Sequence, residues 1–316
     1  MSSDLLKLQH YVPRFYLRAW AVRKKLWVLQ GRNIFNSNVR NVAAQNYFYR
    51  LHELSAEDIQ FVREMVINNS PEGLRSGHEF LLKAFTLPHR VKRALEQSGR
   101  QEPEFRKLVE ESITNLNEKY HGAIESEFKH QIDGLISGDM SFLKEPQQEM
   151  LFYRGLAAQM LRTNVMIRAK AIFQQAQYET FSRVANVVVQ ILAVNLGLNL
   201  YSTRDQYKLV LLNNFSNVPF VTADQPIINI AANPTETTPP KGFELYYPLS
   251  PQKAMMLLDL ESAHSPSDLS VSSGPAHMYN LSMAAHSHYQ VFASSPPELE
   301  AIKSELNAYL SCFRSS

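Results

Sequence analysis

The sequence predicts an α+β fold with a mostly helical middle, an N-terminal β-hairpin and a C-terminal antiparallel β-sheet. Apolar residues recur at steps of three and four through much of residues 51–200, the period of helices that bury one face. Short β-prone runs separated by turn-forming residues precede this region and return after Tyr207. We predict a single domain over residues 1–316, with a basic helix and hairpin in 1–50 and a β-rich part with a closing helix in 201–316.

The first predicted element is a helix from Pro13 to about Val22. Proline fits the first helical position because a helix leaves that N–H group unpaired. The helix puts Arg14 and Arg18 on one face, and His10 precedes its N-terminus, where free N–H groups and the helix dipole favour anions. These groups suit a phosphate or a carboxylate. Alternatively, the arginines pair with surface acids and His10 caps the helix or meets a main-chain carbonyl.

The hairpin and the helical middle follow. Two β-prone runs, Leu26–Gln30 and Ile34–Val39, flank a connection with glycine and asparagine, and the aromatic run Tyr47–Tyr49 is expected to dock this hairpin. Ser55 opens a capping-type sequence that begins a helix. Asn68–Gly77 is predicted as a loop. Further helices are predicted over His78–Phe85, His89–Gln97, Glu104–Leu135, Pro146–Gln177 and Tyr178–Leu198, with Pro88 separating the first two.

The last third predicts a sheet and a closing helix. Pro-rich stretches at Asn233–Lys241 and Glu261–Pro275 are expected to be loops. A helix over Pro297–Leu310 has Ser295 in position to cap it. Strands are predicted at Lys208–Leu212, Pro219–Thr222, Ile227–Ile230, Leu245–Leu249, Ala254–Leu258 and Tyr289–Phe292.

Composition narrows the class of protein. A hydrophobic content of 45% and a charged content of 20% are ordinary for a soluble globular protein. Cys312 is the single cysteine, which excludes an internal disulfide and a Cys-rich zinc site and favours a reducing compartment. Charged and polar residues interrupt the N-terminus, and four amides interrupt the longest apolar run, Val184–Leu200. We therefore expect a cytoplasmic protein without a signal peptide or a membrane partner.

Charge is distributed unevenly along the chain. Residues 1–50 carry nine Lys or Arg and one acid, and residues 151–200 carry five and one. Between them, residues 101–150 carry five bases and eleven acids. The basic segments either neutralise the acidic one in the fold or meet to form a positive cleft for a polyanion, such as nucleic acid or a nucleotide. The sequence leaves both arrangements open.

An acidic turn is the second candidate for chemistry. A β-prone run delivers Thr222 and Asp224 to one side, and Pro226 enforces extended geometry beyond them. Such an acid can be a base, a metal ligand or a group that orients a histidine. The alternative is an Asx turn, in which Asp224 accepts hydrogen bonds from nearby main-chain N–H groups.

The third candidate is an arginine in an apolar helix. Gln159 and Arg162 share a face in a segment rich in Ala, Leu and Met. A buried arginine requires a partner or an anion, because isolating its charge costs several kcal/mol. The partner is either a ligand or a structural acid, namely Asp224 or an acid of the preceding helix.

Other motifs point to no specific chemistry. His286 and His288 are placed on one face of a predicted strand, with His277 upstream, but neither a carboxylate nor a cysteine completes a metal site, so no metal is expected there. The sequence has no phosphate-binding glycine loop and no GxSxG or HExxH motif. No motif identifies a cofactor.

Several motifs together resemble the domain of unknown function 4238 family. They are the opening His10–Leu17 (HYVPRFYL), the aromatic segment Asn41–Tyr49, the Leu161–Thr163 step, Thr222–Pro226 (TADQP) and Tyr247–Pro251 (YPLSP). The family shows a TSDNP-like turn and a PLSP-like strand in the same order. Here alanine and glutamine replace the usual serine and asparagine of the turn, and roughly residues 68–149 match poorly. The resemblance implies a mainly bacterial intracellular protein of unestablished activity.

The resemblance also suggests that four residues belong together. His10, Arg14, Arg162 and Asp224 each lie in or beside a family motif, and we predict that they converge as a catalytic site, with Arg18, Gln159 and Thr222 binding the ligand. One hypothesis is a hydrolase that acts on a phosphate-containing substrate such as nucleic acid. In it, His10 is the general acid or base, the arginines stabilise phosphoryl charge and Asp224 orients His10 or holds a cation. The other hypothesis is a non-catalytic module that binds or senses an anionic ligand. A third reading is a buried polar network that only fixes the fold.

Overall fold

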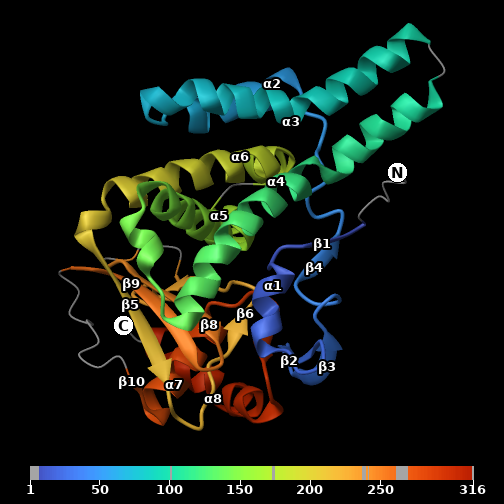
Figure 1. Ribbon diagram of the computed structural model, residues 1–316. Helices are drawn as coiled ribbons and strands as arrows, with labels where there is room; N and C mark the ends of the chain where they lie inside the picture. The colour runs from blue at the N-terminus through green and yellow to red at the C-terminus, as the bar shows by residue number, and fades with distance from the viewer. Residues whose placement is uncertain are drawn as a thin grey trace.

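The computed structural model describes residues 7–99, 102–172, 175–236, 240, 242–260 and 270–314. Figure 1 shows helices α2 to α6 stacked above two β-sheets, with α7 and α8 below the sheets. The long helix α4 runs from a projecting tip down to the sheets and so joins the two levels. The α+β class with a helical middle is therefore confirmed.

The N-terminal segment forms short elements around a small helix. The predicted helix begins near Pro13 as expected, but it ends at Trp20 and not at Val22. Its last turn is a 3-10 helix, after which Ala21 is extended and Val22 pairs with Lys25 in an isolated bridge. The elements are β1 (Leu8–His10), α1 (Arg14–Leu17), the 3-10 helix η1 (Arg18–Trp20), β2 (Lys25–Gln30), β3 (Asn33–Asn38) and β4 (Ala44–Asn46).

The helical middle contains longer elements than predicted. Pro88 does not separate two helices, because it lies buried inside one continuous helix that begins at Glu72, within the predicted loop. Packing of the helix's apolar face outweighs the hydrogen bond that proline removes. The elements are α2 (Ala56–Val62), the π-helix η2 (Arg63–Ile67), α3 (Glu72–Ser98), α4 (Pro103–Ser137), the 3-10 helix η3 (Ser141–Lys144), α5 (Pro146–Ile172) and α6 (Gln175–Ser202).

Local signals explain where these helices begin and end. Ser55 and Asp58 form a reciprocal capping box at α2, as the sequence predicted. Gly138 ends α4 with a φ of 87°, a left-handed conformation that glycine adopts without strain. Gly155 and Gly197 allow α4, α5 and α6 to approach closely, because a side chain at Gly155 would overlap Phe128. This approach brings α5 against the acidic helix α4.

The C-terminal part adds strands to two sheets. Each predicted strand overlaps an observed one, but β6 shares only Thr222 with the predicted Pro219–Thr222, and β11 begins at Val291 and not at Tyr289. Five of the new pairings are antiparallel, and β10 pairs in parallel with β5. The five-stranded sheet has the order β10-β5-β9-β8-β7 and the four-stranded one β3-β2-β11-β6, while β1 and β4 form a separate two-stranded sheet. The hairpin β2–β3 is thus joined to C-terminal strands. The strands are β5 (Tyr207–Asn214), β6 (Thr222–Ala223), β7 (Ile228–Asn229), β8 (Glu244–Ser250), β9 (Lys253–Asp259), β10 (Ser270–Val271) and β11 (Val291–Ala293).

Two helices close the fold, and one of them was not predicted. Helix α7 (Ser273–Ala285) replaces the end of the expected loop, and His286 and His288 follow it in a turn, so their predicted strand placement is wrong. The predicted closing helix is present as α8 (Pro296–Arg314). Most of the predicted loop Glu261–Pro275 lies outside the described residues. Because two polar residues of α7, Asn280 and Ser282, are buried with its apolar ones, the helix lacks the one-sided pattern by which sequence identifies a helix.

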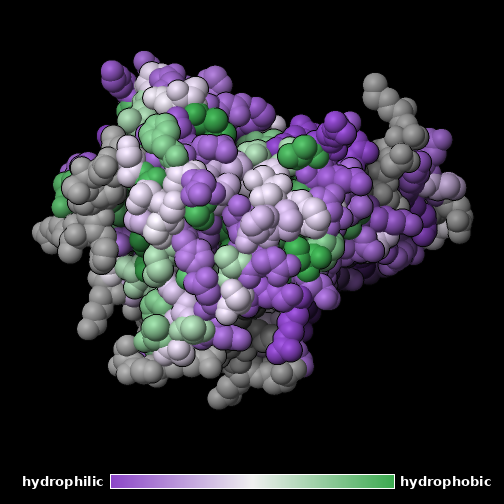
Figure 2. Space-filling view, turned by 90° about the horizontal axis from the view of Figure 1, so that it is seen from below, coloured by the Kyte–Doolittle hydropathy of each residue, from purple (hydrophilic) through white to green (hydrophobic). Residues whose placement is uncertain are grey.

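The apolar core lies between the sheets and the helices. One cluster joins the opening helix, the lower ends of α4 and α5, and the inner face of β8 and β9. A second packs the sheets against α7 and α8, and a third joins α2, α3 and α6. On the face seen in Figure 2, by contrast, hydrophobic residues form small separate groups among hydrophilic ones.

One segment in the described part of the chain, Tyr178–Ser202, is long and apolar enough to cross a membrane. It forms most of α6. Within the fold, 56% of its apolar window is buried, and α2, α3 and α5 pack against it. Contacts with three helices therefore use much of its apolar surface.

Candidate functional site

A cavity of about 630 Å³ lies where α4, α5 and α6 meet the N-terminal strand region and the turn before β11. Its volume is typical of small-molecule sites. Apart from histidines, Arg162 and Asp224 are the charged residues among its described lining residues. Six lining residues are aromatic and five carry a side-chain amide or a hydroxyl: Tyr11, Tyr47, Phe48, Tyr49, Tyr178 and Tyr289, and Gln45, Asn117, Asn186, Gln190 and Ser182.

Arg162 provides the cavity with a buried positive charge. Its side chain is only 3% exposed, and its Nη2 lies 2.6 Å from Oε1 of Glu125 on α4. The guanidinium carbon also lies 5.4 Å from the centre of the Tyr49 ring. The acid of the preceding helix is thus its ion-pair partner, one of the alternatives that the sequence left open. The Nε of Arg162 is buried without a hydrogen-bond partner, so part of this guanidinium remains unused.

A second carboxylate, that of Glu118, lies on α4 about two helical turns before Glu125. Burial raises its pKa to about 7, although Arg162 opposes the rise. Its Oε2 is buried without a hydrogen-bond partner. Neither acid was predicted from the sequence, because an acidic helix face resembles an ordinary solvated surface. Their seven-residue spacing, which places them on the same face, was the available signal.

Asp224 is fully buried and is held by main-chain groups. Its Oδ1 accepts a hydrogen bond from the N–H of His288 at 2.9 Å, and its Oδ2 accepts from Tyr289 and Gln290 at 2.6 and 3.1 Å. Burial nevertheless raises the pKa of Asp224 to about 6. The donors are more than sixty residues away, so this is neither an Asx turn nor an interaction with His10. Asp224 fixes the turn that forms one side of the cavity.

His10 lies beside the cavity and is not one of its described lining residues. Its Nε2 lies 3.1 Å from the carbonyl oxygen of Arg40, which is the structural alternative considered for this residue. Burial lowers the pKa of His10, and Arg14 and then Arg162 lower it further through their charges. His10 and both arginines are therefore electrostatic neighbours. Arg14 and Arg18 are exposed.

The two remaining predicted ligand-binding residues are buried. Thr222 is completely inaccessible, and its Oγ1 lies 2.6 Å from the hydroxyl of Tyr16. Gln159 is 3% exposed, and its Nε2 has no hydrogen-bond partner. Neither residue is among the described residues that line the cavity. A direct ligand contact by Thr222 does not fit this placement, because its hydroxyl is already used inside the core.

Tyr16 joins three of the motifs found in the sequence. Besides approaching Thr222, its hydroxyl donates to the carbonyl oxygen of Pro248 at 2.7 Å. Nearby, the indole N–H of Trp20 donates to the carbonyl oxygen of Phe220 at 2.8 Å. The opening motif, the TADQP turn and the YPLSP strand thus meet in one buried junction. The helix near the N-terminus and the acid-bearing turn are neighbours in space, as predicted.

The aromatic segment forms the cavity wall in a strained conformation. Tyr47 has a φ of 57°, in the left-handed region, which costs on the order of 1–3 kcal/mol for a residue other than glycine. The N–H of Tyr49 donates to Oε1 of Gln9 at 2.6 Å, and Nε2 of Gln9 donates to the carbonyl oxygen of Thr114 at 2.8 Å. These bonds hold β1 and Tyr49 against α4.

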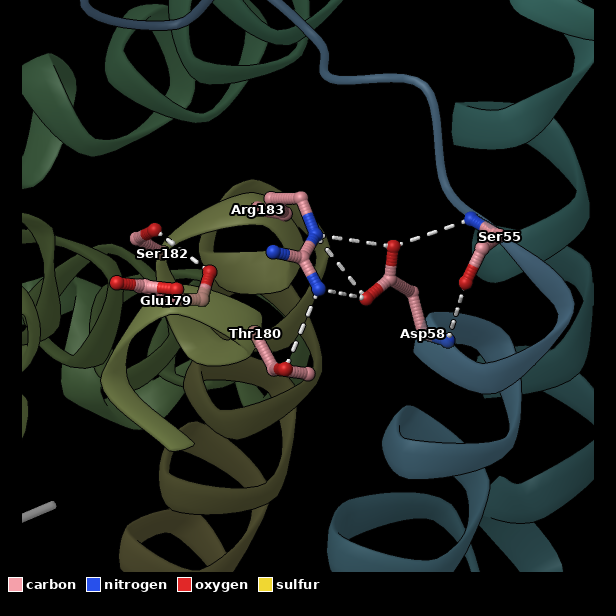
Figure 3. Close-up of polar contacts among 6 residues, drawn as sticks. All are labelled: Ser55, Asp58, Glu179, Thr180, Ser182 and Arg183. Atoms are coloured by element: carbon pink, nitrogen blue, oxygen red, sulfur yellow. Dashed lines mark hydrogen bonds and ion pairs between the residues drawn. The ribbon is translucent and has the colours of Figure 1, made fainter. Parts of the chain in front are cut away.

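The end of α6 nearest the cavity is fixed to α2 by an ion pair (Figure 3). Nη2 of Arg183 donates to Oδ1 of Asp58 at 2.7 Å, and the carboxylate of Asp58 is almost completely buried. This bond to Arg183 holds the pKa of Asp58 below its usual value. Ser182, the residue before Arg183 on α6, donates to the carbonyl oxygen of Glu179 in the same view and lines the cavity. The pair therefore positions one wall of the cavity.

Other features offer less chemistry. No group of three or more His, Cys, Asp or Glu side chains within the described residues is arranged to hold a metal ion. The half-buried His277 lies 2.9 Å from the carboxylate of Glu305, apart from the cavity. A second cavity of about 380 Å³ lies beyond His288, between the end of α7 and β7.

Comparison with known proteins identifies a family. The model of the family DUF4238, described as a protein of unknown function, matches residues 8–297. Neither a curated protein nor a solved structure gives a significant match. The matched range contains the Tyr16 junction and every described residue of the cavity lining. The chain therefore belongs to the DUF4238 family.

Proposed function

We propose that the cavity binds a small organic ligand that carries a phosphate or a carboxylate, and that Arg162 recognises this group. The observation that carries the proposal is a guanidinium buried in a cavity wall with its Nε unpartnered. Arginine presents five N–H donors in a planar fork that matches two oxygens of a phosphate or carboxylate. Glu125 engages Nη2 and Tyr49 contacts the guanidinium as well, which leaves the unpartnered Nε for a ligand.

The charge balance around Arg162 supports this class of ligand. Glu125 compensates Arg162 in the empty site, which keeps the cost of burying the cation low. Glu118, with a pKa of about 7, is largely protonated below neutral pH and then adds no second negative charge. The carboxylate of Asp224 accepts hydrogen bonds from three main-chain N–H groups, which stabilise its charge. The aromatic lining favours a ligand with a flat apolar portion, and the volume favours one small molecule over a polymer.

Phenyl phosphate, which combines one ring with one phosphate, tests the proposal. In isothermal titration calorimetry we expect saturable binding by the unmodified protein and a loss of affinity of about 10- to 100-fold in Arg162→Gln. Arg154→Gln is the matched control, because Arg154 lies on the same helix and pairs with Glu127 on α4 at 3.2 Å. That variant should retain affinity.

Folding is checked by circular dichroism. If Arg162→Gln does not fold, Arg162→Lys retains the charge without the planar fork and should still weaken binding. Failure of the unmodified protein to bind phenyl phosphate or inorganic phosphate at millimolar concentrations would contradict the proposal, as would equal affinity in Arg162→Lys.

Phosphoester hydrolysis is the second candidate, favoured by two titratable groups, Glu118 and His10, that both interact electrostatically with Arg162. Burial raises the pKa of Glu118 to about 7 and lowers that of His10, and Arg162 acts on both. A protonated Glu118 is suited to donate to a leaving group, and a neutral His10 to accept a proton from water. Arg162 would stabilise phosphoryl charge.

Hydrolysis of bis(p-nitrophenyl) phosphate tests this candidate. We expect Glu118→Gln and His10→Ala each to lower kcat by about 100-fold or more, with phenyl phosphate affinity retained. The His10→Ala variant loses one hydrogen bond to a carbonyl oxygen, so the melting temperature of this variant should change little. If the unmodified protein releases no nitrophenol, hydrolysis of this diester is discarded and the binding proposal stands.

A further inference from the structure

Four polar side chains form a second cluster in the cavity wall, contributed by two helices. Asn117 and His121 come from α4, and Asn186 and Gln190 come from α6. All four line the cavity, and all but the half-buried Asn186 are at most 3% exposed. A polar cluster of this kind is stable only if its members satisfy one another or another partner.

Most atoms of the cluster are satisfied internally. Nδ2 of Asn117 donates to Oδ1 of Asn186 at 3.2 Å, and Nδ2 of Asn186 donates to the carbonyl oxygen of Arg50 at 2.9 Å. Nε2 of Gln190 donates to Oδ1 of Asn117 at 3.0 Å and lies 2.7 Å from Nε2 of His121. The imidazole must accept in that contact, so it is the neutral form protonated on Nδ1. Burial, which lowers the pKa of His121, favours the same form.

The amide oxygen of Gln190 is the exception. Both N–H bonds of the amide are directed at acceptors, which fixes the orientation of the group, and Oε1 is buried without a hydrogen-bond partner. A buried acceptor without a donor costs about 1–3 kcal/mol. Asn195, further along the same helix, shows the contrast: its Oδ1 and Nδ2 both have partners at 2.8 Å.

A row of aromatic rings begins at His121, the neighbour of Gln190, and lines the same cavity. Tyr49 lies 4.7 Å from the His121 ring, Phe48 packs edge-on against Tyr49 at 4.9 Å, and Tyr11 lies 5.2 Å from Phe48. Tyr49 also packs against the guanidinium of Arg162. The ring faces and the polar cluster therefore occupy the same cavity as the arginine.

We propose that a nucleobase, a planar nitrogen heterocycle with an N–H donor at its edge, binds in this half of the cavity and donates a hydrogen bond to Oε1 of Gln190. The inference rests on the proposed function, since the phosphate of the same nucleotide would bind Arg162. Amide side chains are the usual readers of base edges, and aromatic rings stack on bases. The bond requires the Gln190 amide to shift slightly toward the cavity that it lines.

Binding of fragments separates this inference from the proposed function. The four 5′-ribonucleoside monophosphates are compared in calorimetry with ribose 5-phosphate, which lacks a base, and with the nucleosides, which lack phosphate. We expect at least one nucleotide to bind about 10-fold or more tightly than ribose 5-phosphate, because a hydrogen bond and ring contacts are added. In Gln190→Met this excess should fall to about 3-fold or less, with ribose 5-phosphate affinity unchanged.

Two further variants control the result. Gln148→Met replaces an amide that pairs with Gln131 and does not line the cavity, and it should keep the nucleotide preference. Gln190→Glu keeps an acceptor oxygen, and neutral His121 can donate to the carboxyl group from Nε2 by a change of tautomer. This variant should retain base-dependent binding, which also tests the assignment if Gln190→Met does not fold.

Each result has one reading. Equal affinity for nucleotides and ribose 5-phosphate overturns the inference and leaves the proposed phosphate site intact, and so does a nucleotide preference that survives Gln190→Met. Nucleosides that bind as tightly as nucleotides support the base site and contradict the phosphate site. Absence of binding by every compound overturns both.

Discussion

Two polar regions of this protein are assembled from segments that are distant in sequence and adjacent in space, yet their hydrogen bonding differs. At the Tyr16 junction, the tyrosine hydroxyl contacts both Thr222 and the Pro248 carbonyl, and the atoms lie in the core. In the cavity wall, by contrast, Nε of Arg162 and Oε1 of Gln190 lack hydrogen-bond partners, and both residues line the cavity. A satisfied and sealed network contributes to stability, whereas an unsatisfied one beside a cavity offers interactions to a ligand.

Asp224 lies at the boundary between the two regions, and its removal should have the largest effect on stability. Asp224→Ala leaves the N–H groups of residues 288–290 without their acceptor. We expect the free energy of unfolding in urea to fall by about 3–5 kcal/mol. Asp224→Asn retains one acceptor oxygen and should lose less. A loss below about 1 kcal/mol in Asp224→Ala would place Asp224 with the ligand-binding wall and not with the structural junction.

The ionisation of Asp224 should make stability depend on pH. Its pKa is about 6 in the folded protein against an ordinary value of 3.8. Because the folded state favours the protonated form, the contribution of the Asp224 carboxyl group to the free energy of unfolding is fully present below pH 3.8. It is lost as pH rises through about 6. The difference amounts to about 3 kcal/mol.

The measurement compares the free energy of unfolding of the unmodified protein with that of Asp224→Asn across this pH range. Glu118 is present in both proteins, so the comparison isolates the contribution of Asp224. The difference between the two proteins should shift in favour of the variant as pH rises. A difference that is independent of pH would mean that the three N–H groups fully offset the burial of the charge.

A smaller effect is expected for Tyr16→Phe, which would remove the hydroxyl at the centre of the junction. Two buried oxygens then lose their contact with it, and we expect a loss of about 2 kcal/mol with unchanged phenyl phosphate affinity. Tyr246→Phe is the matched control, since Tyr246 is also fully buried but its hydroxyl has no hydrogen-bond partner. Its stability should stay the same or rise slightly. Equal losses in both variants would show that hydroxyl bonding does not distinguish the junction.

Much of the fold was readable from local patterns. The hairpin, the α2 capping box and the long acidic helix follow from turn residues, a Ser–Asp pair and helical periodicity, none of which needs tertiary information. The failures have physical causes. Pro88 signals a helix end, but packing keeps α3 continuous. Helix α7 buries polar as well as apolar residues, so its sequence shows no clear helical period.

The candidate site was only partly predictable. Arg162 was identified because a cation in an apolar helix requires a partner, and Asp224 because an acid follows a buried strand. Glu118, Glu125 and Gln190 were missed because acids and amides on helices are usually solvated. Their significance arises from burial against α5 and α6, which the spacing of residues on one helix does not specify. The roles of His10, Arg14 and Arg18 in function remain predictions.

The sequence by itself determined the order and type of most elements, since periodicity and turn chemistry act between residues close along the chain. It also contained the motifs that resemble the DUF4238 family, and these lie within the matched range of residues 8–297. Only the tertiary structure decided which polar groups are satisfied: it assigned Thr222 to Tyr16, Asp224 to the turn before β11 and Arg162 to Glu125. The reason is that hydrogen bonding and desolvation depend on neighbours brought together from distant positions, and these neighbours leave Arg162 and Gln190 with unused atoms.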